Sequence, residues 1–272
     1  MVGTHAVTAQ RAVDQAGQVG VSMKALPTSP TEDLSQERLG ALTPGEFVAL
    51  LREQCSLPGR GMANHPVLAA LEAGSVTLPQ LRLFTEQWYL HNRNMLPWIG
   101  QIYVTCPHED VRATLAKNLA EECLGAFTGT KAHPELMLDF AAFIGMDVEQ
   151  TRGKEQLADG RRVTEYFEFM ATCRPWYVPL AAIGIGLETF VPQALTRMRA
   201  ALKANYRIPD DKLVFWTMHI TTDIEHGDEG MEMVARYAVT PQARKQVYDA
   251  TIETSVLSFK LWNMFSTIGG RQ

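Results

Sequence analysis

Two histidines and an aspartate recur at helical spacing in the stretch 219–226, which reads HITTDIEH. His219, Asp223 and His226 stand at i, i+4 and i+7, so on an α-helix they lie within about 60° of one another. The preceding residues 213–216 read LVFW and indicate a buried helix. Buried polar groups cost free energy unless they are paired or ligated. The triplet therefore predicts either a metal site or a His-Asp-His cluster that only satisfies its own hydrogen bonds.

The composition is that of a globular protein, with 272 residues, 46% hydrophobic and 20% charged residues, and a net charge of −5. No Lys/Arg cluster suggests a nucleic-acid partner. The longest apolar run, at about 178–191, is too short to span a bilayer, so we expect no membrane association. The four cysteines have no C-x-x-C spacing, and no signal peptide precedes them. We therefore expect reduced thiols and a cytoplasmic protein.

Apolar residues at three- and four-residue spacing predict helices along most of the chain. Residues 43–46 (TPGE) are typical of a helix entry, and Pro97 predicts a kink or break. A helix is expected to start at residues 78–79, with an apolar pattern that runs to residue 102, and others from about 109 to 145, 161 to 173, 179 to 204 (interrupted at Pro192), 210 to 237 and 241 to 264. Residues 1–40, rich in Gln, Ser, Thr, Gly and Pro, are expected to form a mobile leader. The prediction is all-α, with one domain of seven to nine helices over residues 41–272.

Three further segments offer side chains that could reach a metal from neighbouring helices. Glu121 and Glu122 stand in apolar company, and His133 follows in the same helical region, 109–145. Glu188 lies within the run IGIGLETFV, where a buried, unpaired carboxylate would be costly. The alternative for Glu188 is a salt bridge to a core Arg or Lys.

Together these segments supply three imidazoles and three carboxylates: Glu122, His133, Glu188, His219, Asp223 and His226. Such a mixed set suits iron or manganese better than thiolate-preferring metals, and suits two metals better than one. Neither paired Glu-x-x-His motifs nor a His-Glu-x-x-His zinc motif is present.

The ordered set resembles that of the heme-oxygenase-like dimetal oxidases and oxygenases, which are relatives of thiaminase-II and pyrroloquinoline-quinone-synthase (PqqC-like) proteins. The matching pieces are NLAEE at 118–122 with the downstream His133, FIG at 143–145, GLE at 186–188 and the triplet in 219–226. The resemblance implies a seven-helix bundle in which the six residues named above hold two Fe(II) ions, with manganese as the alternative metal. It implies Glu188 as the bridging carboxylate, and Glu122 rather than Glu121 as the ligand.

The resemblance also implies that the protein activates O2 to oxidise a small amino-acid-like, amine or carboxylate substrate in specialised metabolism. Family chemistry includes oxidative C–C cleavage, desaturation and N-oxygenation. Some N-oxygenating members carry an extra carboxylate ligand on the preceding helix, but residues 91–98 (HNRNMLPW) contain no acid. This absence favours cleavage or desaturation. An external electron donor and a homodimer are compatible with the resemblance.

Several side chains are candidates for contact with the substrate. Arg93 could bind a substrate carboxylate with two hydrogen bonds, although it could equally be a surface charge. The other candidates, each of which could instead belong to the core, are Trp88, Tyr89, His91, Trp176 and Tyr177.

Three other functions compete with the dimetal hypothesis. A metal-free thiaminase-II-like or PqqC-like enzyme could use Cys123 or Cys173, and a true heme oxygenase could bind heme through His65 or His91. Neither accounts for six metal-type donors in one chain. The third is a non-enzymatic helical binding protein, in which apolar residues could replace Glu188 and the triplet.

Overall fold

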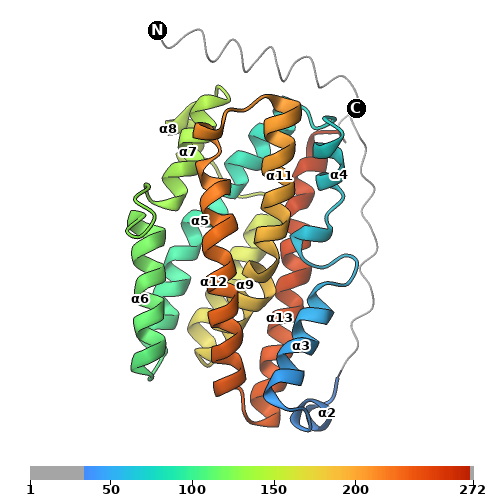
Figure 1. The fold of residues 1–272 in the computed structure, drawn as a ribbon, viewed down its shortest axis with the longest axis vertical. Helices are drawn as coiled ribbons and strands as arrows, with labels where there is room; N and C mark the ends of the chain where they lie inside the picture. The colour runs from blue at the N-terminus through green and yellow to red at the C-terminus, as the bar shows by residue number, and fades with distance from the viewer. Residues whose placement is uncertain (1–33, 270–272) are drawn as a thin grey trace.

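The computed structural model describes the backbone of residues 34–269 and the side chains of residues 34–224 and 227–265. Every regular element in this part of the chain is helical, and the long helices run roughly along the longest axis of the molecule (Figure 1). The α-helices are α2 (Gln36–Gly40), α3 (Pro44–Cys55), α4 (Val67–Glu72), α5 (Leu78–Thr105), α6 (Glu109–Leu124), α7 (His133–Phe143), α8 (Val148–Arg152), α9 (Ala158–Cys173), α10 (Tyr177–Ala181), α11 (Val191–Tyr206), α12 (Val214–Tyr237) and α13 (Pro241–Leu261). The all-α prediction is confirmed.

Shorter helical turns connect several of these helices. A π-helical segment, Ala182–Leu187, and a 3₁₀ turn, Glu188–Phe190, join α10 to α11. Further 3₁₀ turns cover Met62–Asn64, Asp210–Lys212 and Trp262–Gly269. π-Helical turns are rare and often occur at functional sites, because they displace the residues that follow from the ordinary helical register. Glu188 stands directly after this one.

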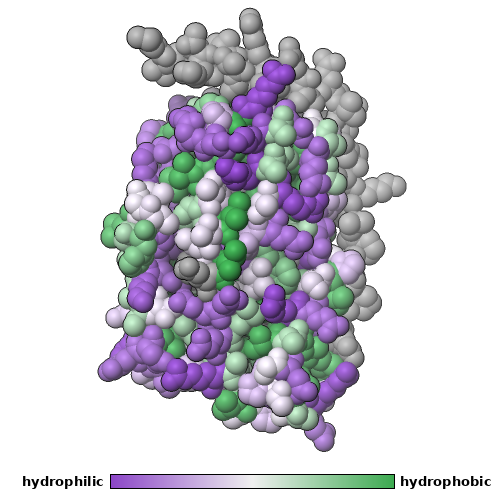
Figure 2. All heavy atoms as spheres, in the orientation of Figure 1, coloured by the Kyte–Doolittle hydropathy of each residue, from purple (hydrophilic) through white to green (hydrophobic). Residues whose placement is uncertain are grey.

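One continuous core of buried apolar side chains joins the helices. Helix α5 packs against α6, α7 and α9, while α12 packs against α11 and the π-helical segment. The face shown in Figure 2 is mostly hydrophilic, with hydrophobic residues in small patches. The long helices are therefore held by their shared apolar faces, and α5, α6, α7 and α12 are placed around one interior region.

The local signals for helix entry are confirmed. The Thr43 hydroxyl accepts a hydrogen bond from the Glu46 backbone N–H, and the Glu46 carboxylate accepts one from the Thr43 backbone N–H. Thr77 and Gln80 form the same capping box at the start of α5. Of the two outcomes expected at Pro97, a kink or a break, the break is wrong, because α5 continues through Pro97 to Thr105.

The helical region expected over residues 109–145 is divided into two helices. Helix α6 ends at Gly125, whose φ of +60° is left-handed, and α7 begins at His133. A Cβ atom at Gly125 would lie 2.5 Å from the Thr130 carbonyl oxygen, so the turn needs glycine for space as well as for φ. Glu122 and His133 thus come from different helices rather than from one.

The folded region begins earlier than the predicted boundary at residue 41. Helix α2 falls within the expected leader, its Ser35 cap accepts a hydrogen bond from the Arg38 backbone N–H, and Leu39 is fully buried. Leu34 is also buried, so at least residues 34–40 belong to the packed structure. The rest of the predicted leader, residues 1–33, lies outside the described residues.

The apolar run at 178–191 belongs to a longer helical stretch than the sequence suggested. Tyr177–Tyr206 spans 30 residues and is, by length and composition alone, long and apolar enough to cross a membrane. Its apolar window is 72% buried inside the fold, and a core helix of a soluble protein meets the same criteria. The interruption expected at Pro192 lies instead in the π-helical segment, and Pro192 stands in the first turn of α11, where proline is well tolerated.

Gly186 allows the π-helical segment to pack closely against α13. A Cβ atom there would lie 2.8 Å from the Thr251 carbonyl oxygen. Gly186→Ala is therefore expected to lower the free energy of unfolding by about 1–3 kcal/mol. Gly100→Ala is the control: no atom lies within 4 Å of its Cβ, so in the interior of α5 it should raise that free energy by about 0.5–1 kcal/mol. Equal thermal midpoints for the two variants would contradict this close packing.

Candidate metal centre

His219 is fixed on α12 by its own helix. Its Nδ1–H donates to the Phe215 carbonyl oxygen one turn earlier at 2.9 Å, since a carbonyl can only accept. This hydrogen bond sets the tautomer in which Nε2 carries the lone pair, as is usual for histidines that bind metals. The Phe215 ring packs against the imidazole with ring centroids 4.1 Å apart. His219 is thus oriented as a metal ligand would need to be.

His133, at the start of α7, lies between the two acids at the end of α6. Its Nε2 is 3.4 Å from Oε1 of Glu121, and its Nδ1 is 2.7 Å from Oε2 of Glu122. The second pair is close but is not aligned as a hydrogen bond, and Nδ1 has no hydrogen-bond partner among the described residues. His133 Nδ1 and Glu122 Oε2 lie close together without pointing at each other, so both could bind the same third atom. This arrangement fits a shared metal ion.

Glu121 and Glu122 have different environments. Glu121 accepts hydrogen bonds from the backbone N–H groups of Phe127 and Thr128, at 2.7 and 3.2 Å, and from the Thr128 hydroxyl. It therefore closes the turn between α6 and α7, and it also faces His133 Nε2. Histidines that bind metals commonly donate their second N–H to a carboxylate. Glu121 is thus engaged by the turn and by His133 Nε2, while Glu122 faces His133 Nδ1; Glu122 as the metal ligand stays a prediction.

The ligand atoms of Glu122, His133 and His219 lie within 4.8 Å of one another, and all three residues are buried. The imidazoles of His133 and His219 meet edge to face, with ring centroids 4.6 Å apart. These donors come from three helices, α6, α7 and α12, which lie far apart in the sequence. The cluster is therefore a product of the tertiary fold.

A narrow cavity beside this cluster brings in two more of the predicted donors. Its wall includes Glu122, Glu188, His219 and Asp223, and α5 and the start of α11 complete it. The cavity volume is about 20 Å³, close to the space that one water molecule needs. The five donors that the structure describes thus lie at or beside one small space. The sixth predicted ligand, His226, has a side chain outside the described residues.

The electrostatics of this space favour a cation. Burial raises the pKa of Asp223 well above its usual 3.8, and the nearby carboxylates of Glu188 and Glu122 raise it further. Burial lowers the pKa of His133, but contact with Glu122 and Glu121 outweighs it, so the net pKa is raised. Carboxylates packed together in a low-dielectric site repel one another unless protons or metal ions compensate their charge. Divalent ions would do so while binding carboxylate and imidazole ligands.

The predicted substrate-binding residues do not all meet at this cavity. Trp88 and His91, both buried on α5, line it. Arg93 is exposed and donates to the Arg152 carbonyl oxygen at 3.1 Å, so the structure does not bring it to the site. Tyr89 is buried outside the cavity wall, with the Arg93 guanidinium 5.5 Å from its ring centroid.

Trp176 and Tyr177 are likewise separate from the cavity. They form an aromatic group with His108 and Tyr237, and the Tyr177 hydroxyl donates to Gln246 at 3.2 Å. These two residues behave as ordinary packing residues between α10, α12 and α13. Helical spacing alone could not distinguish this role from contact with a substrate.

The side chains that the rival functions need are poorly placed for those functions. Cys123 and Cys173 are exposed free thiols, and neither lines the cavity. Partial burial and the Glu122 charge raise the pKa of Cys123, which opposes thiolate formation. His65 is committed to the fold, because its Nδ1 accepts from the Val67 N–H and its Nε2 contacts Asn263.

Comparison with known proteins identifies the family of this chain. Residues 82–255 match the model of a family described as iron-containing redox enzymes, within the heme-oxygenase-like group. The chain belongs to this family. The matched residues include all six predicted metal ligands. The side chain of one of them, His226, lies outside the described residues.

Curated relatives of this iron-containing redox enzyme are named as synthases. This chain is 26% identical over 205 residues to a 4-aminobenzoate synthase of Nitrosomonas europaea, and the match covers 72% of this chain and 81% of the synthase. It is also 26% identical over 201 residues to a 4-chloro-allylglycine synthase of Streptantibioticus cattleyicolor, covering 74% and 76%. Among solved structures, a TenA homologue from Pseudomonas syringae matches with a TM-score of 0.69 at 11% identity, covering 89% of this chain and 99% of that one. The first two similarities support an oxidoreductase-type enzyme, and the third shows the fold.

Proposed function

We propose that this protein is a non-heme di-iron oxidoreductase that uses O2 to oxidise a small amino-acid-like or amine substrate. The observation that carries the proposal is the buried cluster of Glu122, His133 and His219, with Asp223 and Glu188 beside it. A mixed set of imidazoles and carboxylates is the ligand chemistry of iron and manganese. His226, one turn after Asp223 on α12, is proposed as the sixth ligand.

The protein residues around the cluster would each perform a definite task. Two ferrous ions bound there would supply the activation of O2. The Phe215 carbonyl and the Glu121 carboxylate orient His219 and His133, respectively, through the nitrogen that faces away from the cluster. The apolar residues Met95, Leu187 and Val191 line the cavity and limit the entry of water.

The names of the curated relatives support the substrate class. The products 4-aminobenzoate and 4-chloro-allylglycine both carry an amino group and a carboxyl group, and the second contains a carbon–carbon double bond. An amino-acid-like substrate and a desaturation or C–C cleavage reaction are therefore the preferred proposal for this chain. N-Oxygenation is the alternative. An external electron donor, a homodimer and a cytoplasmic location stay predictions.

Anaerobic reconstitution with ferrous iron tests the proposal. We expect the full-length protein to bind close to two irons, and to consume O2 faster when the right member of a panel of amino acids, amines and fatty acids is added. Glu188→Ala and His219→Ala should lose iron and substrate-dependent O2 uptake. Glu232→Ala is a matched control, because Glu232 is an exposed residue of the same helix as His219. If the wild type binds no metal and the two ligand variants are as stable as it is, a metal-free enzyme or a binding protein becomes the better explanation.

His91 gives a second, independent test of the cavity. Its imidazole is 1% exposed, and neither ring nitrogen has a hydrogen-bond partner among the described residues. An unsatisfied buried polar group costs about 1–3 kcal/mol, so His91→Leu should leave stability unchanged or raise it. The same change should lower substrate-dependent O2 uptake at least about tenfold if a ligand in the cavity uses these nitrogens.

His65→Leu is the matched control for this experiment. His65 is buried to a similar extent, and burial lowers the pKa of each imidazole to about 4, but His65 has hydrogen-bond partners. Its replacement should lower the thermal midpoint because the Val67 N–H loses its acceptor. If His91→Leu and His65→Leu destabilise the fold equally, His91 has a structural role and the cavity function assigned to it is wrong.

A further inference from the structure

Helix α5 contributes two buried polar side chains to the wall of the cavity beside the metal cluster, which is called the metal cavity below. Trp88 and His91 both line this cavity, and only 4% and 1% of their surface is exposed. Within the described part of the chain, neither the Trp88 indole N–H nor either ring nitrogen of His91 has a hydrogen-bond partner. Neither residue belongs to the six predicted metal ligands. Their polar atoms are therefore available to a ligand inside the metal cavity.

His91 differs in this respect from the other buried histidines that the structure describes. His65, His133 and His219 each engage at least one ring nitrogen with another residue. The partners are the Val67 N–H for His65, the Glu121 carboxylate for His133 and the Phe215 carbonyl for His219. An unsatisfied buried polar group destabilises the fold, so such a group in a native structure needs an explanation. Binding of a ligand is an explanation that the position of His91 in the cavity wall supports.

The Trp88 side chain is held in place by its neighbours. Its ring stacks on Phe84, with centroids 5.6 Å apart, and meets the Trp262 ring edge to face at 5.8 Å. The His91 ring lies 5.2 Å away on the same helix. Asn92, the next polar residue in the cavity wall, already donates its amide N–H to the Trp88 carbonyl at 2.7 Å. A donor that is fixed before binding loses little conformational entropy when a ligand arrives.

The chemistry of Trp88 and His91 selects an acceptor of hydrogen bonds. An indole offers one N–H donor, and a neutral imidazole offers one N–H donor and one acceptor nitrogen. Burial lowers the pKa of His91 to about 4, so its ring is uncharged at neutral pH. The apolar side chains of Met95, Leu187 and Val191 lie in the same wall. Two uncharged N–H donors beside metal-type ligands suit a small molecule that binds a metal ion and accepts hydrogen bonds at the same time.

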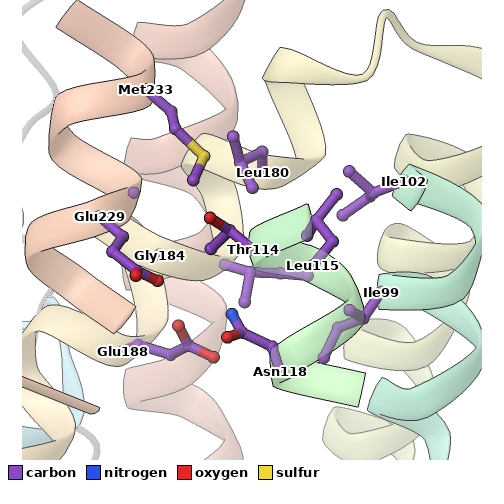
Figure 3. Close-up of a pocket in the computed structure, with 12 residues that line it drawn as sticks. Ile99, Ile102, Thr114, Leu115, Asn118, Leu180, Gly184, Glu188, Glu229 and Met233 are labelled. Carbon is purple, nitrogen blue, oxygen red and sulfur yellow. The ribbon is translucent and has the colours of Figure 1, made fainter. Parts of the chain in front are cut away.

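A second cavity adjoins the metal cavity, with Glu188 in the wall of both (Figure 3). Helix α5 lines both cavities, through His91 and Met95 in the first and through Ile99 and Ile102 in the second. Residues at this spacing share one face of the helix. The other apolar residues around the second cavity are Leu115, Leu180, Ile183 and Met233. Apolar surroundings of this kind suit O2, which is uncharged and dissolves better in apolar media than in water.

We propose that Trp88 and His91 form the binding site for the small oxygen ligand of the metal centre. O2, or a small anion in its place, accepts one hydrogen bond from the Trp88 indole N–H and one from an N–H of His91. The proposal rests on the proposed function, because O2 is the natural ligand only if the metal centre activates it. It goes beyond that function in assigning retention of this ligand to two residues of α5 that do not bind metal.

Azide binding to the full-length protein loaded with Co²⁺ tests the assignment. Azide is a small anion that binds metal ions and accepts hydrogen bonds, and the visible absorption of Co²⁺ responds to its ligands. Trp88→Phe keeps an aromatic ring but loses the N–H, and His91→Leu loses both ring nitrogens. Each change is expected to weaken azide binding about tenfold or more, because a hydrogen bond to a charged ligand is lost. His91→Gln keeps an N–H donor and should restore most of the affinity.

Trp262→Phe is the matched control for Trp88→Phe. Trp262 is fully buried and its N–H also has no partner in the described part of the chain, but it does not line the metal cavity. This variant should keep the wild-type azide affinity, and all four variants should keep the wild-type Co²⁺ content. Unchanged affinity in Trp88→Phe or in His91→Leu, or an equal loss in Trp262→Phe, would overturn the assignment. Loss of Co²⁺ from His91→Leu would also overturn it, because His91 would then be a metal ligand.

The same titrations separate this proposal from the proposed function. If the Co²⁺ protein shows the expected azide affinities but the ferrous protein consumes no O2 with any substrate, the O2-dependent function is wrong and the small-anion site stands. If the wild type binds no Co²⁺ and no iron, the di-iron function is contradicted. Calorimetric titration of the metal-free protein with azide then decides the role of the two residues: weaker binding in Trp88→Phe and His91→Leu supports it, and no binding to the wild type overturns it.

Discussion

Replacing Glu122 with glutamine is expected to remove iron from the protein and to lower iron-dependent O2 uptake by at least about 100-fold. Loss of residues that only support a metal ligand commonly costs 10–100-fold in affinity or activity, and loss of a ligand should cost more. Glu122 is proposed as a ligand because its carboxylate lies 2.7 Å from His133 Nδ1 without hydrogen-bonding alignment, and because it lines the cavity beside the cluster. Iron analysis after anaerobic loading measures the effect directly.

Glu121→Gln is the matched comparison for this experiment. The Glu121 carboxylate holds the turn at 127–128, and a glutamine oxygen can still accept from these N–H groups, so the loss of the negative charge should cost only about 1 kcal/mol of stability. Burial raises the pKa of Glu121, but the hydrogen bonds from Thr128 and Phe127 outweigh it and lower the pKa below 4.5. Its stabilising effect is therefore present above pH 4.5 and lost as the pH falls further. Loss of iron in Glu121→Gln but not in Glu122→Gln would reverse the assignment of the two acids.

Stabilisation of the protein by a divalent metal is expected to grow as the pH rises from 6.5 to 9. The folded state raises the pKa of Asp223 and of His133, so each binds more protons in the metal-free folded chain than in the unfolded chain. The metal-free protein should therefore lose stability as the pH rises through this range. Metal binding requires deprotonated ligands, so it should release protons and be favoured at higher pH. The bound metal should therefore offset the stability that the metal-free protein loses as the pH rises.

Thermal unfolding with and without Mn²⁺ measures this linkage. Mn²⁺ takes the place of ferrous iron here because it does not consume O2 as ferrous iron does. At a free metal concentration of about 100 times Kd, ligand binding adds about 2.7 kcal/mol, or roughly 5–10 °C for a chain of this size. The measurement starts at pH 6.5 because burial lowers the pKa of His65 and His91 to about 4, which makes the protein less stable at lower pH. Asp223→Asn should flatten the pH dependence of the metal-free protein. A metal-induced shift that is equal at pH 6.5 and pH 9 would contradict the linkage.

Local patterns in the amino-acid sequence were enough to establish the fold class and the types of side chain available to bind a metal. Helical spacing is a local property, so the capping box at Thr43 and the shared face of His219 and Asp223 could be predicted from neighbouring residues. The order of Glu122, His133, Glu188 and the triplet was enough to indicate the family to which the chain belongs. Periodicity could not fix where helices end, as the continuation of α5 through Pro97 and the break between α6 and α7 demonstrate.

Packing between helices, by contrast, sets which of these residues meet and what each one contacts. Adjacent acids are about 100° apart on a helix, but the sequence does not say which one faces the core; here the turn after Gly125 engages Glu121 and leaves Glu122 at the cavity. Arg93 and His91 are two residues apart on α5, yet helix rotation and packing place Arg93 at the surface and His91 in the cavity wall. The metal cavity depends on contacts between α5, α6, the π-helical segment and α12, whose residues are distant in the chain. Spacing within one helix carries no information about such contacts, because they follow from how apolar faces of different helices pack together.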